Sequence, residues 1–412
     1  VGIDDNFFDI GGDSFKAIRA VRQIGTTVSV MQLFQHPTIR ELAAFLADDE
    51  TSHPSDLLYE LTPPIPAAQR QFTVVCIPYG GGSALAYHPL AQAMPENVSL
   101  FAVEMPGHDF SQATEAKLTL RELAARCAEE IEATVSGPML LYGHCVGSAL
   151  AVEIGRLLEA KQRAPLGIVL GGNFPSPRLR QLEFFHTYLP LERLTSSRMI
   201  YEAMRGVGGF TDVLDPAEQK FVINNMRYDV RQASDYYTET SRTQPAKLAT
   251  PICCVVAEED PATEFYQERT ADWLTYSTEV SLQRIPKAGH YFLKHQANEL
   301  AELIAAQAEG WLGSGQKENA AQPITHPPQS SSFNIFLLVA FGQLISMIGT
   351  GLTTFTLGIW ALEQTNALVN FTIISIFALL PGILVSPLAG AAADRGDRRR
   401  VMIGSDVLAA CG

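Results

Sequence analysis

Cys145 stands in the short stretch Gly-His-Cys-Val-Gly, between an apolar run that predicts a strand and an amphipathic run that predicts a helix. A thiol at the start of a helix is suited to nucleophilic attack, because the helix N-terminus and a nearby imidazole both favour the thiolate. Gly143 and Gly147 allow the chain to turn sharply on either side of it. An isolated cysteine would be interpreted as a small buried hydrophobe, but this spacing favours a catalytic one.

A histidine and a group of carboxylates could complete a nucleophile–acid–base set with this thiol. His290 follows the last predicted strand and is the candidate general base. Two positions in the sequence could supply the acid. The strand after the Cys145 helix is followed only by Asn173, whereas a later strand is followed by a run of carboxylates that ends in Glu259 and Asp260. We expect Asp260 to be the acid, with Glu259 as the fallback.

A glycine-rich turn after the first long apolar run could supply an oxyanion hole. Backbone N–H groups there can stabilise the negative charge that develops on a carbonyl oxygen under attack. We expect Gly80 to be one donor, with Gly81 as the next candidate, and Val146, the residue after the nucleophile, to be the other. His144 is expected to be structural, because a direct chain neighbour of the thiol points the wrong way to act as its base.

The elements that must position these groups form an alternating pattern. Six short apolar runs, separated by helical patterns, lie at 72–78, 98–106, 138–143, 166–172, 251–260 and 280–286. Such alternation predicts a mainly parallel sheet with crossover helices. The order Cys145, acid, His290 and the Gly-x-Cys-x-Gly stretch resemble the α/β-hydrolase fold, except that this fold usually has serine at the nucleophile position.

Composition narrows the class of protein. The 412 residues carry 30 basic and 44 acidic side chains, a net charge of −14, which argues against a nucleic-acid binder. Six cysteines show neither metal-ligand nor disulfide-framework spacing, and with no secretory signal visible we expect a reducing, cytoplasmic setting. No metal site is predicted. Because the sequence opens at Val1 in the middle of a pattern, we expect it to be an internal piece of a longer polypeptide.

Residues 1–48 carry a second candidate site. Ser14 ends the string GGDS immediately before an apolar helical pattern, a position that would also suit a simple helix cap. With VMQLFQHPTIRELAAFL behind it, the string resembles the second half of a peptidyl carrier domain of nonribosomal peptide synthetases. The resemblance implies that Ser14 carries a 4'-phosphopantetheine arm, that the first helix of the carrier lies before Val1, and that upstream synthetase modules are partners.

Residues 70–312, after a Pro-rich linker at 49–69, resemble the thioesterases of nonribosomal peptide and polyketide assembly lines, closest to their type II-like branch. The matching strings are IPYGGGSALAYHPLA, MPGHDF, YGHCVG, EEDPATEFYQERTADW and AGHYF. The resemblance implies a helical lid at about 174–245. The arginine that is common after Pro-Gly in this family is absent, since His108 stands there, so we expect different contacts at that point.

The last part of the chain is strongly apolar. After a polar linker at 313–332, two uncharged runs at 333–362 and 367–393 predict membrane-spanning helices. The arginine cluster at 395–400 is expected on the cytoplasmic side by the positive-inside rule, which would tether the catalytic part to the inner face of the membrane. The string GAAADRGDRRRVMI resembles major facilitator transporters, and implies that 333–412 is the start of an exporter.

Together these resemblances imply a thioesterase that releases a carrier-tethered peptidyl or acyl chain through an acyl–Cys145 intermediate, by cyclisation, aminolysis or hydrolysis. Two alternatives stay open. One is a hydrolytic editing enzyme that clears misloaded carriers, and the other is a non-catalytic docking module that links carrier and transporter. An unrelated hydrolase with a Cys-His-Asp set is less compatible with the adjacent GGDS string.

Overall fold

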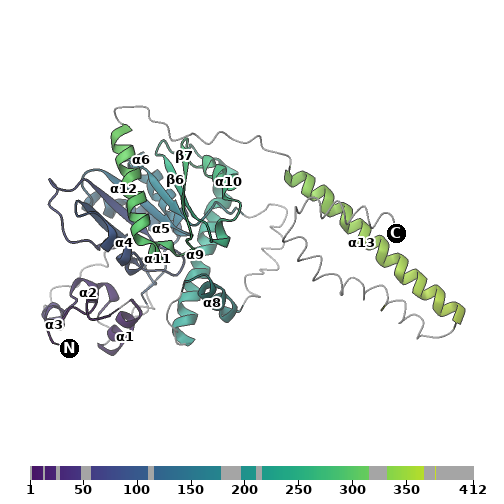
Figure 1. Cartoon of the computed structure of the whole chain (residues 1–412), viewed down its shortest axis with the longest axis horizontal. Helices are drawn as coiled ribbons and strands as arrows, with labels where there is room; N and C mark the ends of the chain where they lie inside the picture. The colour runs from purple at the N-terminus through teal and green to yellow at the C-terminus, as the bar shows by residue number, and fades with distance from the viewer. Residues whose placement is uncertain are drawn as a thin grey trace. The chain divides into compact units, whose positions relative to one another are not determined.

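One sheet lies at the centre of the unit that spans Val1–Thr325 (Figure 1). Its seven described strands are β1 Leu58–Glu60, β2 Phe72–Ile77, β3 Val98–Val103, β4 Met139–His144, β5 Ile168–Gly171, β6 Ile252–Ala257 and β7 Val280–Ile285. Their order is β1-β3-β2-β4-β5-β6-β7, and all neighbouring pairs are parallel except β1 with β3. This confirms the predicted α/β-hydrolase type of fold with a mainly parallel sheet.

This computed structural model describes residues 2–12, 14–24, 28–47, 57–109, 116–177, 196–209, 216–314 and 332–365, together with Ile376. The α-helices described in the first unit are α1 Ser14–Ile24, α2 Val30–Gln35, α3 Ile39–Ala47, α4 His88–Ala93, α5 Leu120–Thr134, α6 Gly147–Ala160, α8 Ser197–Gly206, α9 Pro216–Thr243, α10 Tyr266–Arg269, α11 Phe292–His295 and α12 Ala297–Ser314. Three 3₁₀ turns are described as well, at Ala84–Tyr87, Pro261–Thr263 and Thr270–Thr275.

All six strands predicted from the apolar runs are confirmed, but β1 was missed. It lies inside the stretch 49–69 that the sequence predicts to be a linker, and it pairs antiparallel with β3 at the edge of the sheet. The carboxylate of Glu130 on α5 accepts the backbone N–H groups of Leu57 and Leu58, at 3.0 and 2.7 Å. A strand of three residues is too short for a period-2 pattern to indicate it.

Alternating strand residues divide the core between the two faces of the sheet. Val75 and Cys254 pack with α5, α6 and part of α9 in one apolar cluster. Their chain neighbours Val74 and Cys253 pack with α4 and α12 in the other cluster. Because successive side chains of a strand point to opposite faces, runs buried on both sides read as continuous apolar stretches. Cys253 and Cys254 are accordingly both buried strand residues, one on each face of the sheet.

The helices between β5 and β6 occupy the stretch that the family resemblance assigns to a lid. Helices α8 and α9 lie within 174–245, whereas residues 178–195 and 210–215 lie outside the described residues. Helix α9 is 28 residues long and packs against α6 and α5 as well as α8. It therefore reaches from the lid region onto the body of the fold.

The second unit spans His326–Gly412, and the boundary between the units falls inside the predicted linker 313–332. A single long helix, α13 Ser332–Thr365, is described there. Among the described residues, no helix is both long and apolar enough to cross a membrane, so the spanning helix predicted at 333–362 is not supported. The second predicted span, 367–393, lies outside the described residues except for Ile376, and so do the arginines at 395–400.

Candidate active site

Cys145 occupies a sharp turn between the end of β4 and the start of α6. Its φ is +53°, a left-handed conformation that is uncommon for a residue other than glycine. Two close approaches explain the flanking glycines. A Cβ on Gly143 would lie 2.8 Å from the Cβ of Ala151, and one on Gly147 would collide with the backbone oxygen of Pro78. The backbone therefore forms a strained elbow between strand and helix, the geometry that the Gly-x-Cys-x-Gly stretch predicts.

The elbow supports a prediction about stability. Replacing Gly147 by alanine should lower the free energy of unfolding by about 1–3 kcal/mol, because the added methyl overpacks the turn against backbone rather than a movable side chain. Gly310→Ala is the matched control, since Gly310 also lies in a helix but has open space around its Cβ position. That control should change stability little, or raise it by roughly 0.5–1 kcal/mol. Denaturant unfolding of both variants makes the comparison, and equal midpoints would contradict it.

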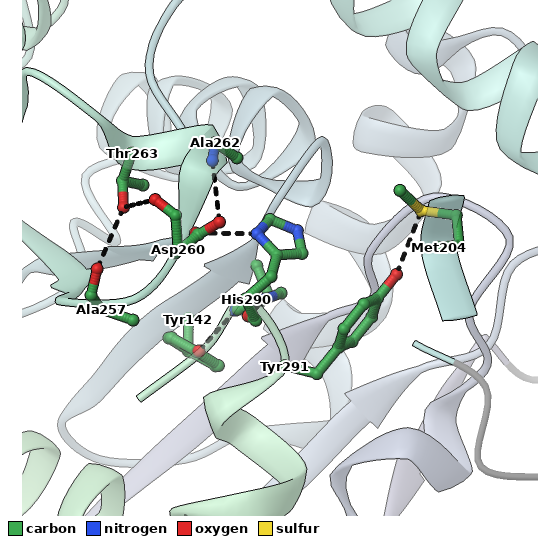
Figure 2. Close-up of polar contacts among 9 residues, drawn as sticks. Tyr142, Met204, Ala257, Asp260, Ala262, Thr263, His290 and Tyr291 are labelled. Carbon is green, nitrogen blue, oxygen red and sulfur yellow. Dashed lines mark hydrogen bonds and ion pairs between the residues drawn. The ribbon is translucent and has the colours of Figure 1, made fainter. Parts of the chain in front are cut away.

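His290 and Asp260 form a buried pair beside this turn. His290 lies in the loop between β7 and α11, and its Nδ1 is 2.8 Å from Oδ2 of Asp260 (Figure 2). The other carboxylate oxygen of Asp260 accepts the backbone N–H of Ala262 at 2.9 Å, which holds the carboxylate in place. Because Nδ1 donates its hydrogen bond to Asp260, Nε2 is the ring nitrogen that can exchange a proton with Cys145. The side chains of His290 and Asp260 are only 7% and 1% exposed.

The electrostatics of His290 favour its charged form. Burial alone would lower its pKa, but hydrogen bonds and charge interactions with Asp260 and with Cys145 outweigh burial and raise the pKa to about 10. At neutral pH the ring is then an imidazolium. A cation next to a cysteine favours the thiolate, which is the reactive form. The three side chains can therefore perform nucleophilic chemistry with proton transfer through His290.

The other acid positions considered from the sequence do not reach His290. Glu259 is exposed, and its backbone N–H donates to the carbonyl of Ala288 at 2.9 Å. Asn173 follows β5 and carries no carboxylate. Asp260 is thus the carboxylate that the fold brings to His290.

Gly80 and Val146 lie close together beside the turn that carries Cys145. A Cβ built on Gly80 would be 3.1 Å from Cγ2 of Val146. Within the described part of the chain, the backbone N–H groups of these two residues donate to no other residue. The N–H of Gly81, by contrast, donates to Oδ2 of Asp229 at 2.8 Å. Gly80 and Val146 can therefore form an oxyanion hole, whereas Gly81, the next candidate from the sequence, has its N–H already engaged.

His144 holds the backbone of the His290 loop. It is fully buried, and its Nε2 is 2.9 Å from the carbonyl oxygen of His290 while its Nδ1 is 3.0 Å from the hydroxyl of Tyr142. A carbonyl only accepts, so Nε2 donates and Nδ1 accepts from Tyr142, which defines a neutral tautomer. Burial first, and then the charge of His290, lower its pKa well below the ordinary value. The structural role predicted for His144 agrees with these contacts, but no sequence signal indicated its partner.

Ser14 is the first residue of α1, which confirms that it opens a helix. The first turn of α1 carries no acidic residue, and the positive end of a helix is suited to a phosphate group. The start of α1, where Ser14 lies, is therefore compatible with the phosphodiester of a 4'-phosphopantetheine arm. Among the described residues, no cluster of histidine, cysteine and carboxylate side chains could hold a metal ion.

Comparison with known proteins agrees with this geometry. Residues 72–308 match the thioesterase domain model, and residues 1–46 match the model of the phosphopantetheine attachment site, which supports 4'-phosphopantetheine as the cofactor. The chain is 25% identical over 240 residues to the protein named "Probable cadicidin biosynthesis thioesterase" of Streptomyces griseus, covering 58% of this chain and 63% of that protein. It is 25% identical over 243 residues to the thioesterase PikA5 of Streptomyces venezuelae, covering 58% of this chain and 82% of PikA5.

Two further similarities extend the comparison. The phenyloxazoline synthase MbtB of Mycobacterium tuberculosis is 24% identical over 345 residues, which are 74% of this chain but only 23% of MbtB. The solved structure of the type II thioesterase BorB, from the borrelidin biosynthetic cluster, is 25% identical with a TM-score of 0.49, covering 63% of this chain and all of BorB. Since the matched thioesterase domain makes up more than half of the sequence, this chain belongs to the thioesterase family.

Proposed function

We propose that this thioesterase releases peptidyl or acyl chains from the carrier of a nonribosomal peptide or polyketide assembly line, through an acyl intermediate on Cys145. The observation that carries the proposal is the position of Cys145, at φ +53° on the elbow and within hydrogen-bonding reach of His290, which is paired with the buried Asp260. The relatives support the setting, because PikA5 is named a thioesterase and MbtB a phenyloxazoline synthase.

When bound, the phosphopantetheine arm supplies a thiol that presents the chain as a thioester. The Sγ of Cys145 attacks the thioester carbonyl carbon, and the N–H groups of Gly80 and Val146 stabilise the resulting oxyanion. When the bond between that carbon and the departing sulfur breaks, His290 gives its proton to the leaving thiolate. The products of this half-reaction are the free carrier thiol and an acyl group on Cys145, so no oxidant or reductant is needed.

In the second half-reaction an amine, a hydroxyl or water attacks the carbonyl carbon of the acyl–Cys145 thioester. His290 removes the proton of the attacking group, and the Cys145–carbon bond breaks. Exchange of one thioester for another is close to thermoneutral, so the acyl group keeps its activation until this step. That property suits attack by a group within the chain itself, and we therefore place cyclisation or aminolysis ahead of hydrolysis.

Contacts between the carrier part and the thioesterase part favour release over editing. The N–H of Val30 on α2 is 3.1 Å from a carboxylate oxygen of Asp109. The rings of Phe8 and Phe34 pack against His88 on α4, with centroids 5.9 and 5.2 Å away. A donor held on the surface of its own thioesterase is at high local concentration, which suits an enzyme that acts on that donor.

The exporter and the membrane tether remain proposals from the sequence alone. They are supported by the apolar runs and by the string at 390–403, not by the described helices. We propose that the catalytic part faces the cytoplasm, as the free cysteines of its sheet require no oxidising compartment.

The mass of the released product distinguishes the outcomes. The full chain, loaded on Ser14 with an acyl or peptidyl pantetheine that carries an internal amine or hydroxyl, should yield a product lacking the mass of water relative to the free acid. A product with the mass of the free acid alone would leave release in place but make it hydrolytic. No release, with the protein folded and several chain lengths tried, would contradict the enzymatic proposal and favour the docking module.

A further inference from the structure

The turn that carries Gly80 is held by a side chain from the lid region. The N–H of Gly82 donates to the carbonyl of Tyr79 at 2.8 Å, and Gly81 has a φ of +73°, which together define a type II turn. The central peptide of this turn joins Gly80 to Gly81. Its N–H is the one that donates to Asp229 on α9, so Asp229 fixes the orientation of the peptide next to the proposed oxyanion donor.

The same oxygen of Asp229 has a second partner. Nε2 of His108, in the loop after β3, lies 2.9 Å from Oδ2 of Asp229, while Nδ1 of His108 lies 3.2 Å from the carbonyl oxygen of Pro106. A carboxylate and a carbonyl both accept hydrogen bonds, so both ring nitrogens donate and His108 is an imidazolium. Its side chain is 3% exposed and that of Asp229 is 11% exposed. The pair is thus a nearly buried ion pair.

One face of α9 makes all of these contacts. Asn225, one turn before Asp229, donates from its side chain to the carbonyl of Gly107 at 3.0 Å. Two more residues of this face contact the glycine turn. A Cβ on Gly80 would meet Met226, and one on Gly81 would come within 2.8 Å of the carbonyl oxygen of Val222. Residues spaced three and four apart share a helix face, so this face of α9 packs the His108 loop and the glycine turn together.

We propose that Asp229 and His108 are positioning residues of the oxyanion hole: Asp229 clamps the Gly80–Gly81 peptide, and His108 orients and neutralises the Asp229 carboxylate. This inference rests on the proposed function, because it takes Gly80 as an oxyanion donor. Removing one partner would leave the other charge buried and unpaired, and the freed peptide could then turn away from Val146. The effect should fall on the step in which the oxyanion forms.

Two reactions of Cys145 separate positioning from general damage. Acyl transfer from an acyl-pantetheine thioester passes through an oxyanion, whereas alkylation by iodoacetamide requires only an accessible thiolate. In the full chain, Asp229→Asn should lower kcat for acyl transfer by about 10- to 100-fold, with KM nearly unchanged, because the donor is displaced rather than deleted. Its rate of alkylation should stay within about twofold of the unmodified protein.

His108→Gln is the second variant, for the case in which Asp229→Asn does not fold. It should also lower kcat for acyl transfer while the rate of alkylation stays unchanged. Glu239→Gln is the matched control, since Glu239 also lies on α9 and pairs with Arg121 at 3.0 Å, but its side chain is 53% exposed and touches neither the turn nor the loop. A kcat that stays at the control value, or acyl transfer and alkylation that fall together, would overturn the positioning role. Absence of acyl transfer in the unmodified protein would instead overturn the proposed function, and this inference with it.

Discussion

Replacement of Cys145 by alanine should abolish formation of the acyl-enzyme and lower the rate of product release by about 10³-fold or more, because no other described side chain is placed to replace the nucleophile. The thiol lies on a strained turn whose geometry does not depend on the sulfur, since the contacts of Gly143 and Gly147 define it. The variant should therefore fold normally. Single-turnover release from loaded Ser14 measures the effect.

Two controls accompany this variant. Cys127→Ala removes a thiol of α5 that is buried, and burial raises the pKa of this thiol to about 12, so it should remain unreactive and the variant should keep full activity. Cys145→Ser keeps a nucleophile at the same turn and should form an oxygen ester in place of the thioester. Release by Cys145→Ala at the unmodified rate would mean that the site acts without a covalent step.

Replacement of His290 by alanine should slow acyl transfer by about 10²- to 10⁴-fold, the range that a general acid–base side chain contributes. It should also change the reactivity of Cys145 in a pH-dependent way. The pKa of His290 is raised to about 10, so the ring stays cationic across the neutral range and favours the thiolate beside it. Without that cation the sulfur of Cys145 should be less reactive at neutral pH.

The sign of this effect follows from the charge of His290. Alkylation of Cys145 by iodoacetamide at pH 7 should be slower in His290→Ala than in the unmodified protein, because the imidazolium beside the sulfur is gone. As the pH rises through the pKa of His290, about 10, the ring loses its charge in the unmodified protein, and the difference between the two proteins should shrink. His295→Ala serves as the control, since His295 contacts the carbonyl of Gly208 in the lid region and not the thiol. Equal alkylation rates at pH 7 would contradict the ion-pair account.

The residues at strand ends could be predicted from the sequence, and the reason is physical. In a parallel sheet, the carboxyl ends of the strands share one edge, so Cys145 after β4, Asp260 after β6 and His290 after β7 had to lie close together. The apolar run before each of these three residues was enough to predict its place at the end of a strand. The choice of Asp260 over Glu259 agrees with the structure because the turn after β6 buries the first side chain and exposes the second.

The contacts from α9 could not be predicted in this way. Asp229 meets His108 across 121 residues of sequence, and nothing in the polar surface pattern of a long helix distinguishes it from Asp235 or Glu239. The absent family arginine at position 108 indicated only that the contacts there would differ. Strand β1 was missed for a related reason, because its three residues gain their structure from β3 and Glu130 rather than from their own pattern.

The central claim is a covalent acyl group on the sulfur of Cys145. The most direct test is intact-protein mass spectrometry of the full chain, quenched after exposure to an acyl-pantetheine thioester, followed by peptide mapping. The account predicts an adduct on Cys145 that neutral hydroxylamine removes, that is absent in Cys145→Ala, and that resists hydroxylamine in Cys145→Ser. An adduct on another residue, or turnover that persists in Cys145→Ala, would contradict it.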